Sequence, residues 1–201
     1  MKKNKARIAV FVSGGGTNLQ AIIDAQKKGI IKSGEVVLVI SSNENAYALE
    51  RAQNANIKTC VVNKKKYGSA EEYEDELIRV LDKEQIDLIV LAGFMLILSP
   101  KFTSHYKDRI INVHPALIPS FCGEGFYGLK VHQAALDYGV KVTGATVHFV
   151  NEIPDGGRII MQKAVEIKEG DTPEVLQKRV MEQAEWKILP EAIRMIALKE
   201  V

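Results

Sequence analysis

Asn112 and His114 stand two residues apart in RIINVHP, near the end of an apolar run that predicts a buried strand. Side chains at this spacing lie on one face of a strand, and Pro115 ends the run. An asparagine amide donates to a developing oxyanion, and a histidine transfers protons near neutral pH. We therefore interpret the pair as catalytic, although a hydrogen-bonded core histidine gives the same pattern.

A second polar group lies in TVHFVNEIPDGG, where Asp155 precedes Gly156 and Gly157. Two glycines let the chain turn tightly and return the carboxylate over the sheet, where it would orient His114 and raise its pKa. The alternative is a simple hairpin turn. His148, in the preceding strand, is interpreted as possible support, with a structural role favoured over a catalytic one. These histidines and Asp155 lack the tight spacing of metal ligands, so no metal is expected.

The stretch VFVSGGGTNL places Gly14 to Gly16 between an apolar run and a helix-like segment. A strand, a glycine turn and a helix N-terminus expose backbone N–H groups to an anion, usually phosphate. A dinucleotide motif would need glycine at Leu19, and a P-loop would end in Gly-Lys-Ser/Thr. Neither is present, so we expect a smaller phosphorylated ligand, with Thr17 and Asn18 adding contacts. A tight turn without a ligand is the alternative.

The apolar corner LAGFMLIL, which contains Met95 to Leu98, follows a predicted central strand. In an open parallel sheet, ligands bind outside the carboxyl ends of the strands. The corner is therefore either part of the core or the lining of an apolar slot beside Asn112 and His114. Periodicity alone does not distinguish the two.

Strands and helices must position these groups. Four short apolar runs have the composition of buried strands, residues 8–12, 36–40, 87–93 and 109–115, and residues 60–62 predict a short edge strand. Segments whose apolar residues have helical spacing lie between most of these runs. Further along the chain, the stretches KVTGATVHFV and GRIIMQKAVEI predict two strands of an antiparallel ribbon. GDTPEVLQKRV opens a final helix, which Pro190 must kink or restart. The expected fold is α/β: an open, Rossmann-like, mostly parallel twisted sheet flanked by helices, with an antiparallel C-terminal ribbon and a final helix.

Composition excludes several classes of protein. The 201 residues are 46% hydrophobic and 26% charged, which fits one globular domain, and 27 basic and 25 acidic residues give a net charge of +2. Without a dominant basic run, no nucleic-acid partner is expected. The apolar run in MKKNKARIAVFVSGGG is too short for a signal peptide, and no stretch predicts a membrane span. We expect a cytoplasmic protein with Cys60 and Cys122 as reduced thiols.

In order along the chain, SGGGTNLQAII, VLAGFMLILSP, INVHPALIPSF, GATVHFVNEIPDGG and EGDTPEVLQKRV resemble the phosphoribosylglycinamide formyltransferase family of purine synthesis. INVHPALIP and DGG alone would fit the wider formyltransferase superfamily, and the glycine loop and the length narrow the match. The resemblance covers residues 7–196. It implies a single formyltransferase domain over residues 1–201, with a phosphate- and substrate-binding half to about residue 100 and a folate-binding, catalytic half after it.

The resemblance also implies roles for individual residues. The catalytic residues would be Asn112, His114 and Asp155. The phosphate and glycinamide of the ribonucleotide would contact Gly15, Gly16, Thr17, Asn18 and Glu185. The folate would contact Met95, Leu96, Ile97, Leu98, Asn112, Asn151 and Asp155. Many members have arginine at Leu96, and some have one near Ala70 that faces the folate tail, so this chain is expected to contact the tail more weakly or elsewhere.

The implied activity is transfer of the formyl group of 10-formyltetrahydrofolate to the amine of glycinamide ribonucleotide, in a monomer or homodimer that binds only small molecules. A 10-formyltetrahydrofolate hydrolase, which has an added N-terminal regulatory domain in known members, is one alternative. Methionyl-tRNA formyltransferase would need an RNA-binding domain and more basic charge. A non-catalytic phosphate-ligand binding module would explain the glycine loop alone. Cys122 lies in a glycine-rich segment interpreted as a mobile substrate-side loop, and its thiol is interpreted as incidental.

Overall fold

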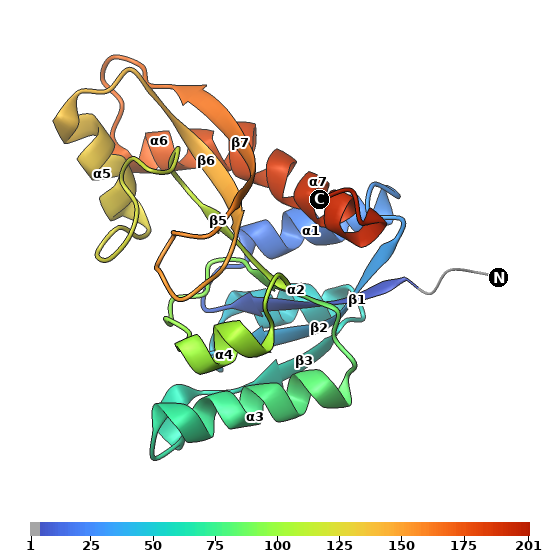
Figure 1. Ribbon diagram of the computed structural model, residues 1–201. Coiled ribbons are helices and arrows are strands. Elements are labelled where there is room, and N and C mark those ends of the chain that lie inside the picture. Colours follow the sequence, from blue (N-terminus) through green and yellow to red (C-terminus); the bar gives the residue numbers. More distant parts are fainter. Residues whose placement is uncertain (1–4) are drawn as a thin grey trace.

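The computed structural model describes residues 5–201 (Figure 1), so Lys2 and Lys3, part of the N-terminal pattern discussed above, lie outside it. Within the described chain, one seven-stranded sheet has the order β3-β2-β1-β4-β5-β6-β7. Its strands are β1 (Ala6–Val12), β2 (Gly34–Ser41), β3 (Lys58–Val61), β4 (Leu88–Leu91), β5 (Ile110–His114), β6 (Val142–Phe149) and β7 (Ile159–Glu166).

The sheet changes strand direction at β5. Strands β3, β2, β1, β4 and β5 are parallel, whereas β6 is antiparallel to both β5 and β7. The mostly parallel α/β fold with an antiparallel C-terminal ribbon is confirmed. The sequence did not show that β6 pairs with β5. That pairing brings the ribbon beside the strand that carries Asn112 and His114.

Helices cover both faces of the sheet (Figure 1). They are α1 (Thr17–Lys27), α2 (Tyr47–Asn54), α3 (Ala70–Lys83), α4 (Pro100–His105), α5 (Leu129–Tyr138), α6 (Pro173–Val180) and α7 (Trp186–Leu198), with a 3₁₀ turn at Lys64–Lys66 and a π turn at Met181–Glu185. Side chains cap the N-termini of two of these helices: Ser99 Oγ accepts from Phe102 N, and Thr172 Oγ1 accepts from Val175 N.

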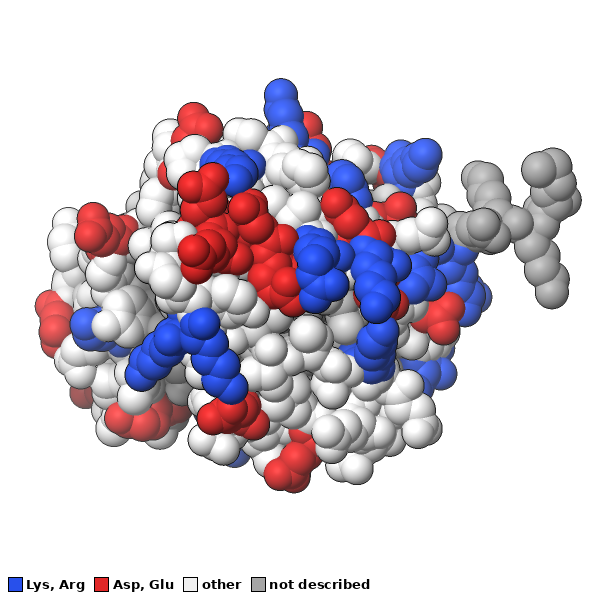
Figure 2. Space-filling model, turned by 90° about the horizontal axis from the view of Figure 1, so that it is seen from below, with Lys and Arg blue, Asp and Glu red and all other residues white. Residues whose placement is uncertain are grey.

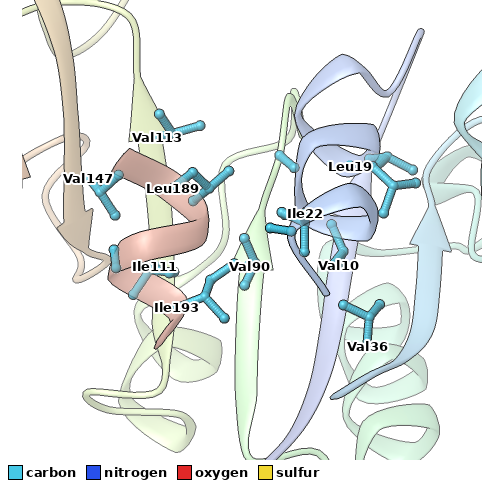
Figure 3. Close-up of a cluster of buried hydrophobic side chains, with 14 of the residues drawn as sticks. Val10, Leu19, Ile22, Val36, Val90, Ile111, Val113, Val147, Leu189 and Ile193 are labelled. Carbon is cyan, nitrogen blue, oxygen red and sulfur yellow. The ribbon is translucent and has the colours of Figure 1, made fainter. Parts of the chain in front are cut away.

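Alternate residues of β1 point into two separate cores, as a strand buried on both faces requires. On one face, Val10 and Val90 pack with Ile22 of α1 and Leu189 and Ile193 of α7 (Figure 3). On the other face, the sheet packs against α3 and α4. Each large apolar side chain buried in this way stabilises the fold by about 1.5–3 kcal/mol.

A wide helical turn joins α6 to α7. Buried residues from Leu176 to Ala192 recur every four positions, whereas an α-helix turns every 3.6 residues, so their face would drift by about 160° in a regular helix. The π turn takes up much of this drift and keeps both helices in the core. Pro190 was predicted to kink or restart this helix. The α-helical pattern restarts at Trp186, the first residue of α7 and four residues before the proline. Only the carbonyl of Trp186 therefore loses the N–H that would donate to it.

Charged side chains of both signs intermingle on the face that carries α3 (Figure 2). None of the helices between residues 5 and 201 is both long and apolar enough to cross a bilayer.

Candidate active site

A cavity of about 840 Å³ lies at the carboxyl end of the parallel strands, where open α/β sheets bind ligands. Its walls come from segments far apart in sequence, among them the start of α1, the loop after β4, the end of β5, a glycine-rich loop, the turn between β6 and β7, and the π turn. Predicted residues that line it are Asn18, Met95, Leu96, Ile97, Leu98, Asn112, His114, His148, Asn151, Asp155 and Glu185.

Strand register places the catalytic candidates beside one another. In the antiparallel pair β5–β6, Asn112 is opposite His148 and His114 is opposite Thr146, so these four side chains share one face of the sheet. Asn112 Nδ2 lies 3.3 Å from His148 Nε2. The other nitrogen of His148, Nδ1, donates to Phe149 O at 2.8 Å, which fixes the ring. His148 therefore lies between the Asn112 amide and Asp155.

The Asp155 carboxylate lies near both histidines. Its position before two glycines predicted the contact with His114 but not the one with His148. Its Oδ2 lies 3.5 Å from His114 Nδ1, and its Oδ1 lies 3.5 Å from His148 Nε2. The close turn needs glycine at position 157, because a Cβ there would lie 1.7 Å from Phe149 O. Burial raises the pKa of Asp155, but the two histidines and the Gly123 amide more than offset it, so the pKa stays below its ordinary value. Asp155 is thus a carboxylate at neutral pH.

His114 departs from the expectation in its titration. The sequence predicted that Asp155 would raise its pKa. Burial lowers the pKa of His114, and this outweighs the opposing effects of Asp155 and of the Phe121 carbonyl, so the pKa lies below its usual value. Nε2 donates to Phe121 O at 2.8 Å while Nδ1 faces Asp155. Both ring nitrogens therefore have protein partners before any ligand binds.

The glycine loop leads into α1 as predicted, but its three glycines differ. A Cβ on Gly16, whose φ is +71°, would lie 2.6 Å from Ala48 Cβ, whereas a Cβ on Gly15 would meet nothing within 4 Å. Gly16 is thus required by packing against α2, and Gly15 leaves open space for a ligand. Gly15, Gly16 and the exposed Thr17 lie outside the cavity lining, which begins at Asn18.

Glu185 is brought to the cavity by the π turn. Its Oε2 accepts a hydrogen bond from Asn18 Nδ2 at 2.6 Å, so the first turn of α1 and the π turn meet through this pair. Burial raises the pKa of Glu185 to about 7, against a lowering by Asn18. Glu182, on the same turn, is exposed. Of Glu182 and Glu185, Glu185 is therefore the one that lines the cavity.

The predicted folate residues divide into exposed and packed side chains. Met95 and Ile97 are 54% and 74% exposed, and both line the cavity. Leu98 is buried in the core with α3 and α4, and Leu96 packs partly against the same cluster. This apolar corner therefore contributes some side chains to the hydrophobic core and others to the wall of the cavity. Asn151 Oδ1 accepts from Ile153 N at 3.0 Å, which shapes the turn before Asp155.

Part of the lining was not named residue by residue from the sequence, although the segment that contains Gly123 to Gly128 was interpreted as a substrate-side loop. Gly123 to Gly128, Lys130, Gln177 and Met181 also face the cavity. The glycine-rich stretch CGEGFYG was the only sequence signal for any of them. This segment lies beside the catalytic candidates, because Gly123 N donates to Asp155 Oδ2 at 2.9 Å and Phe121 O accepts from His114 Nε2 at 2.8 Å. Burial and the Asp155 charge raise the pKa of the Cys122 thiol in this loop, which keeps it protonated.

Comparisons with known proteins agree with this geometry. A family model described as formyl transferase matches residues 6–193. The chain is 44% identical to phosphoribosylglycinamide formyltransferase of Escherichia coli, over 94% of this chain and 86% of that protein. It is 43% identical to trifunctional purine biosynthetic protein adenosine-3 of Homo sapiens, over 98% of this chain but only 19% of that protein. The chain thus spans about a fifth of the length of such trifunctional relatives.

Solved structures give the same result. Glycinamide ribonucleotide transformylase 1 of Symbiobacterium toebii superposes with a TM-score of 0.91 at 42% identity, covering 97% of this chain and 89% of that chain. Phosphoribosylglycinamide formyltransferase of Coxiella burnetii, solved in complex with CHES, superposes with a TM-score of 0.89 at 40% identity, covering 98% and 89%. At these identities the likeness covers sequence as well as fold.

Proposed function

Because this chain belongs to the phosphoribosylglycinamide formyltransferase family, we propose that it transfers the formyl group of 10-formyltetrahydrofolate to the primary amine of glycinamide ribonucleotide. The products are formylglycinamide ribonucleotide and tetrahydrofolate, in purine biosynthesis. One observation carries the proposal: the side chains of Asn112, His114 and Asp155, from two separate segments, converge on one cavity large enough for small-molecule substrates.

The chemistry asked of these residues is acyl transfer. Attack of the amine on the formyl carbon forms a tetrahedral centre and moves negative charge to the formyl oxygen. The Asn112 amide donates a hydrogen bond to that oxygen, and protonated His114 donates one when its Nε2 exchanges the Phe121 carbonyl for the substrate. The bond from carbon to the folate nitrogen then breaks, and the proton lost by the amine reaches the departing nitrogen through His114 and water. No covalent enzyme intermediate is needed, and Asp155 favours the charged form of His114 against the opposing effect of burial.

Two walls of the cavity suit the two substrates. Asn18 and Glu185 offer an amide and a buried carboxyl group to the ribonucleotide, whose phosphate would lie at the open space beside Gly15 and the N-terminus of α1. Met95 and Ile97 offer apolar side chains to the pterin of the folate, opposite the turn from Asn151 to Asp155. The folate supplies the activated formyl group, and the protein supplies position and electrostatics.

An assay with and without the second substrate tests the proposal. Purified protein is mixed with 10-formyltetrahydrofolate, and the folate absorbance is followed in the presence and absence of glycinamide ribonucleotide. Turnover that depends on the ribonucleotide is expected. Turnover without it would instead select a hydrolase, and none in either case would leave a phosphate-ligand binding module.

The cytoplasmic location, the monomeric or homodimeric state and the division of work between the two halves of the chain belong to the same proposal. Cell fractionation and size-exclusion chromatography coupled to light scattering test the first two.

A further inference from the structure

Thr146 joins the strand that carries His114 to the loop that follows it. It lies opposite His114 on β6, and Gln162 lies opposite Thr146 on β7, so the three side chains form a row on one face of the sheet. Thr146 is fully buried. None of the roles derived above uses Thr146 or Gln162.

The Thr146 hydroxyl uses its full hydrogen-bonding capacity on this loop and its neighbour. Oγ1 donates to Ala116 O at 2.7 Å and accepts from Ile118 N at 3.1 Å. It also accepts from Gln162 Nε2 at 3.0 Å, and the same Nε2 donates to Ile118 O at 2.9 Å. One donor and two acceptor positions are all that a hydroxyl has. The loop is therefore fixed at both Ala116 and Ile118.

The next residues of the same loop touch the catalytic candidates. Phe121, three residues after Ile118, accepts a hydrogen bond from His114 Nε2 through its carbonyl at 2.8 Å. Gly123 N donates to Asp155 Oδ2 at 2.9 Å. A shift at Ala116 and Ile118 would displace both contacts. These contacts set how the His114 ring is held and how Asp155 faces it.

We propose that Thr146, supported by Gln162, is a positioning residue for His114: its hydroxyl fixes the Ala116–Ile118 segment and thereby places the Phe121 carbonyl on the imidazole. The inference rests on the proposed transferase reaction for its kinetic readout. Titration of His114 by NMR tests it without turnover, so the two can fail separately.

The experiment compares Thr146→Val, Thr146→Ser and wild type. Valine keeps the shape of threonine but leaves Ala116 O and Ile118 N without their partner. We expect kcat to fall by about tenfold to a hundredfold, as small misplacements of a catalytic group do. KM for both substrates should stay within about threefold, because Thr146 does not line the cavity. Serine should restore most of kcat.

A pH readout separates positioning from general loss of stability. The Phe121 carbonyl raises the pKa of His114, whose other charged or titratable neighbours are Asp155, His148 and His132. Losing this acceptor should lower the NMR-measured pKa of His114 by about half a unit to one unit. The fall of kcat at high pH should move down by the same amount, because the reaction uses protonated His114.

Thr143→Val is the matched control. Thr143 is buried on the same strand, and its hydroxyl has no hydrogen-bond partner among residues 5–201. The control should leave kcat and the pKa of His114 unchanged. A folded Thr146→Val protein with wild-type kcat and an unshifted His114 titration would overturn the inference. So would a Thr146→Ser protein as impaired as the valine variant, because the methyl group would then matter rather than the hydroxyl.

If Thr146→Val does not fold, Gln162→Ala carries the test at an exposed position. This variant removes the hydrogen bonds that Gln162 donates to Ile118 O and Thr146 Oγ1, and at an exposed position water competes for these bonds. We therefore expect a smaller fall in kcat, of about twofold to fivefold, and a pKa of His114 that again shifts downward. An unchanged His114 titration in this variant would equally overturn the inference.

Discussion

Replacing Asp155 by Asn removes one charge and keeps the shape of the side chain. The amide oxygen can still accept from Gly123 N, so the loop stays in place. What is lost is the negative charge 3.5 Å from His114 Nδ1 and from His148 Nε2. The substitution therefore tests whether Asp155 acts by keeping His114 protonated.

The size of the effect follows from the distance. At 3.5 Å and an effective dielectric constant of about 20, a unit charge contributes at most about 5 kcal/mol to the imidazolium. Opposite charges at this range shift a pKa by about 1 to 3 units. Burial already lowers the pKa of His114, so at pH 7.5 the protonated fraction should fall by about tenfold to a thousandfold.

The assay is kcat against pH between 5 and 9, with both substrates saturating. For Asp155→Asn, kcat at pH 7.5 should fall by about a hundredfold. Part of it should return at lower pH, since acid restores the protonated imidazole. Asp137→Asn, which removes an exposed carboxylate on α5, is the control and should match wild type. A folded Asp155→Asn protein with kcat within threefold of wild type and an unshifted profile would refute the reasoning.

Three further predictions concern other positions. Gly15→Val should fold normally and raise KM for the ribonucleotide at least tenfold, whereas Gly16→Val should lower the melting temperature because it collides with α2; equal melting temperatures would contradict the packing argument. Glu185→Gln should raise KM for the ribonucleotide by about tenfold with little change in kcat, since hydrogen bonds to charged groups contribute about 1.5–3 kcal/mol; an unchanged KM would remove Glu185 from the substrate site. Burial lowers the pKa of His132 to about 4, so below about pH 6.5 the unfolded chain binds a proton that the folded chain does not, and stability should fall by about 3 kcal/mol between pH 6.5 and 4. Urea unfolding of His132→Leu should show a shallower loss over this range, with exposed His105→Gln behaving as wild type; equal slopes in the three proteins would rule out the assignment to His132.

Local patterns were sufficient for the fold class and for one part of the site. The alternation of apolar runs and helical spacing predicted a mostly parallel sheet, because strands buried on both faces need continuous apolar residues. Asn112 and His114 were found from their spacing on one strand and from the position of that strand's end. Their neighbours on the sheet were not visible, since strand pairing depends on which residues meet across more than thirty positions of chain.

The sequence by itself predicted that Asp155 would follow a strand and precede a tight turn, because two glycines come directly after it. The tertiary structure decided what that carboxylate meets, how deeply His114 is buried, and hence that burial outweighs the charge in setting its pKa. It also decided that Gly16 serves packing while Gly15 leaves space. Burial and distance arise from the whole packed chain, and no local spacing of residues encodes them.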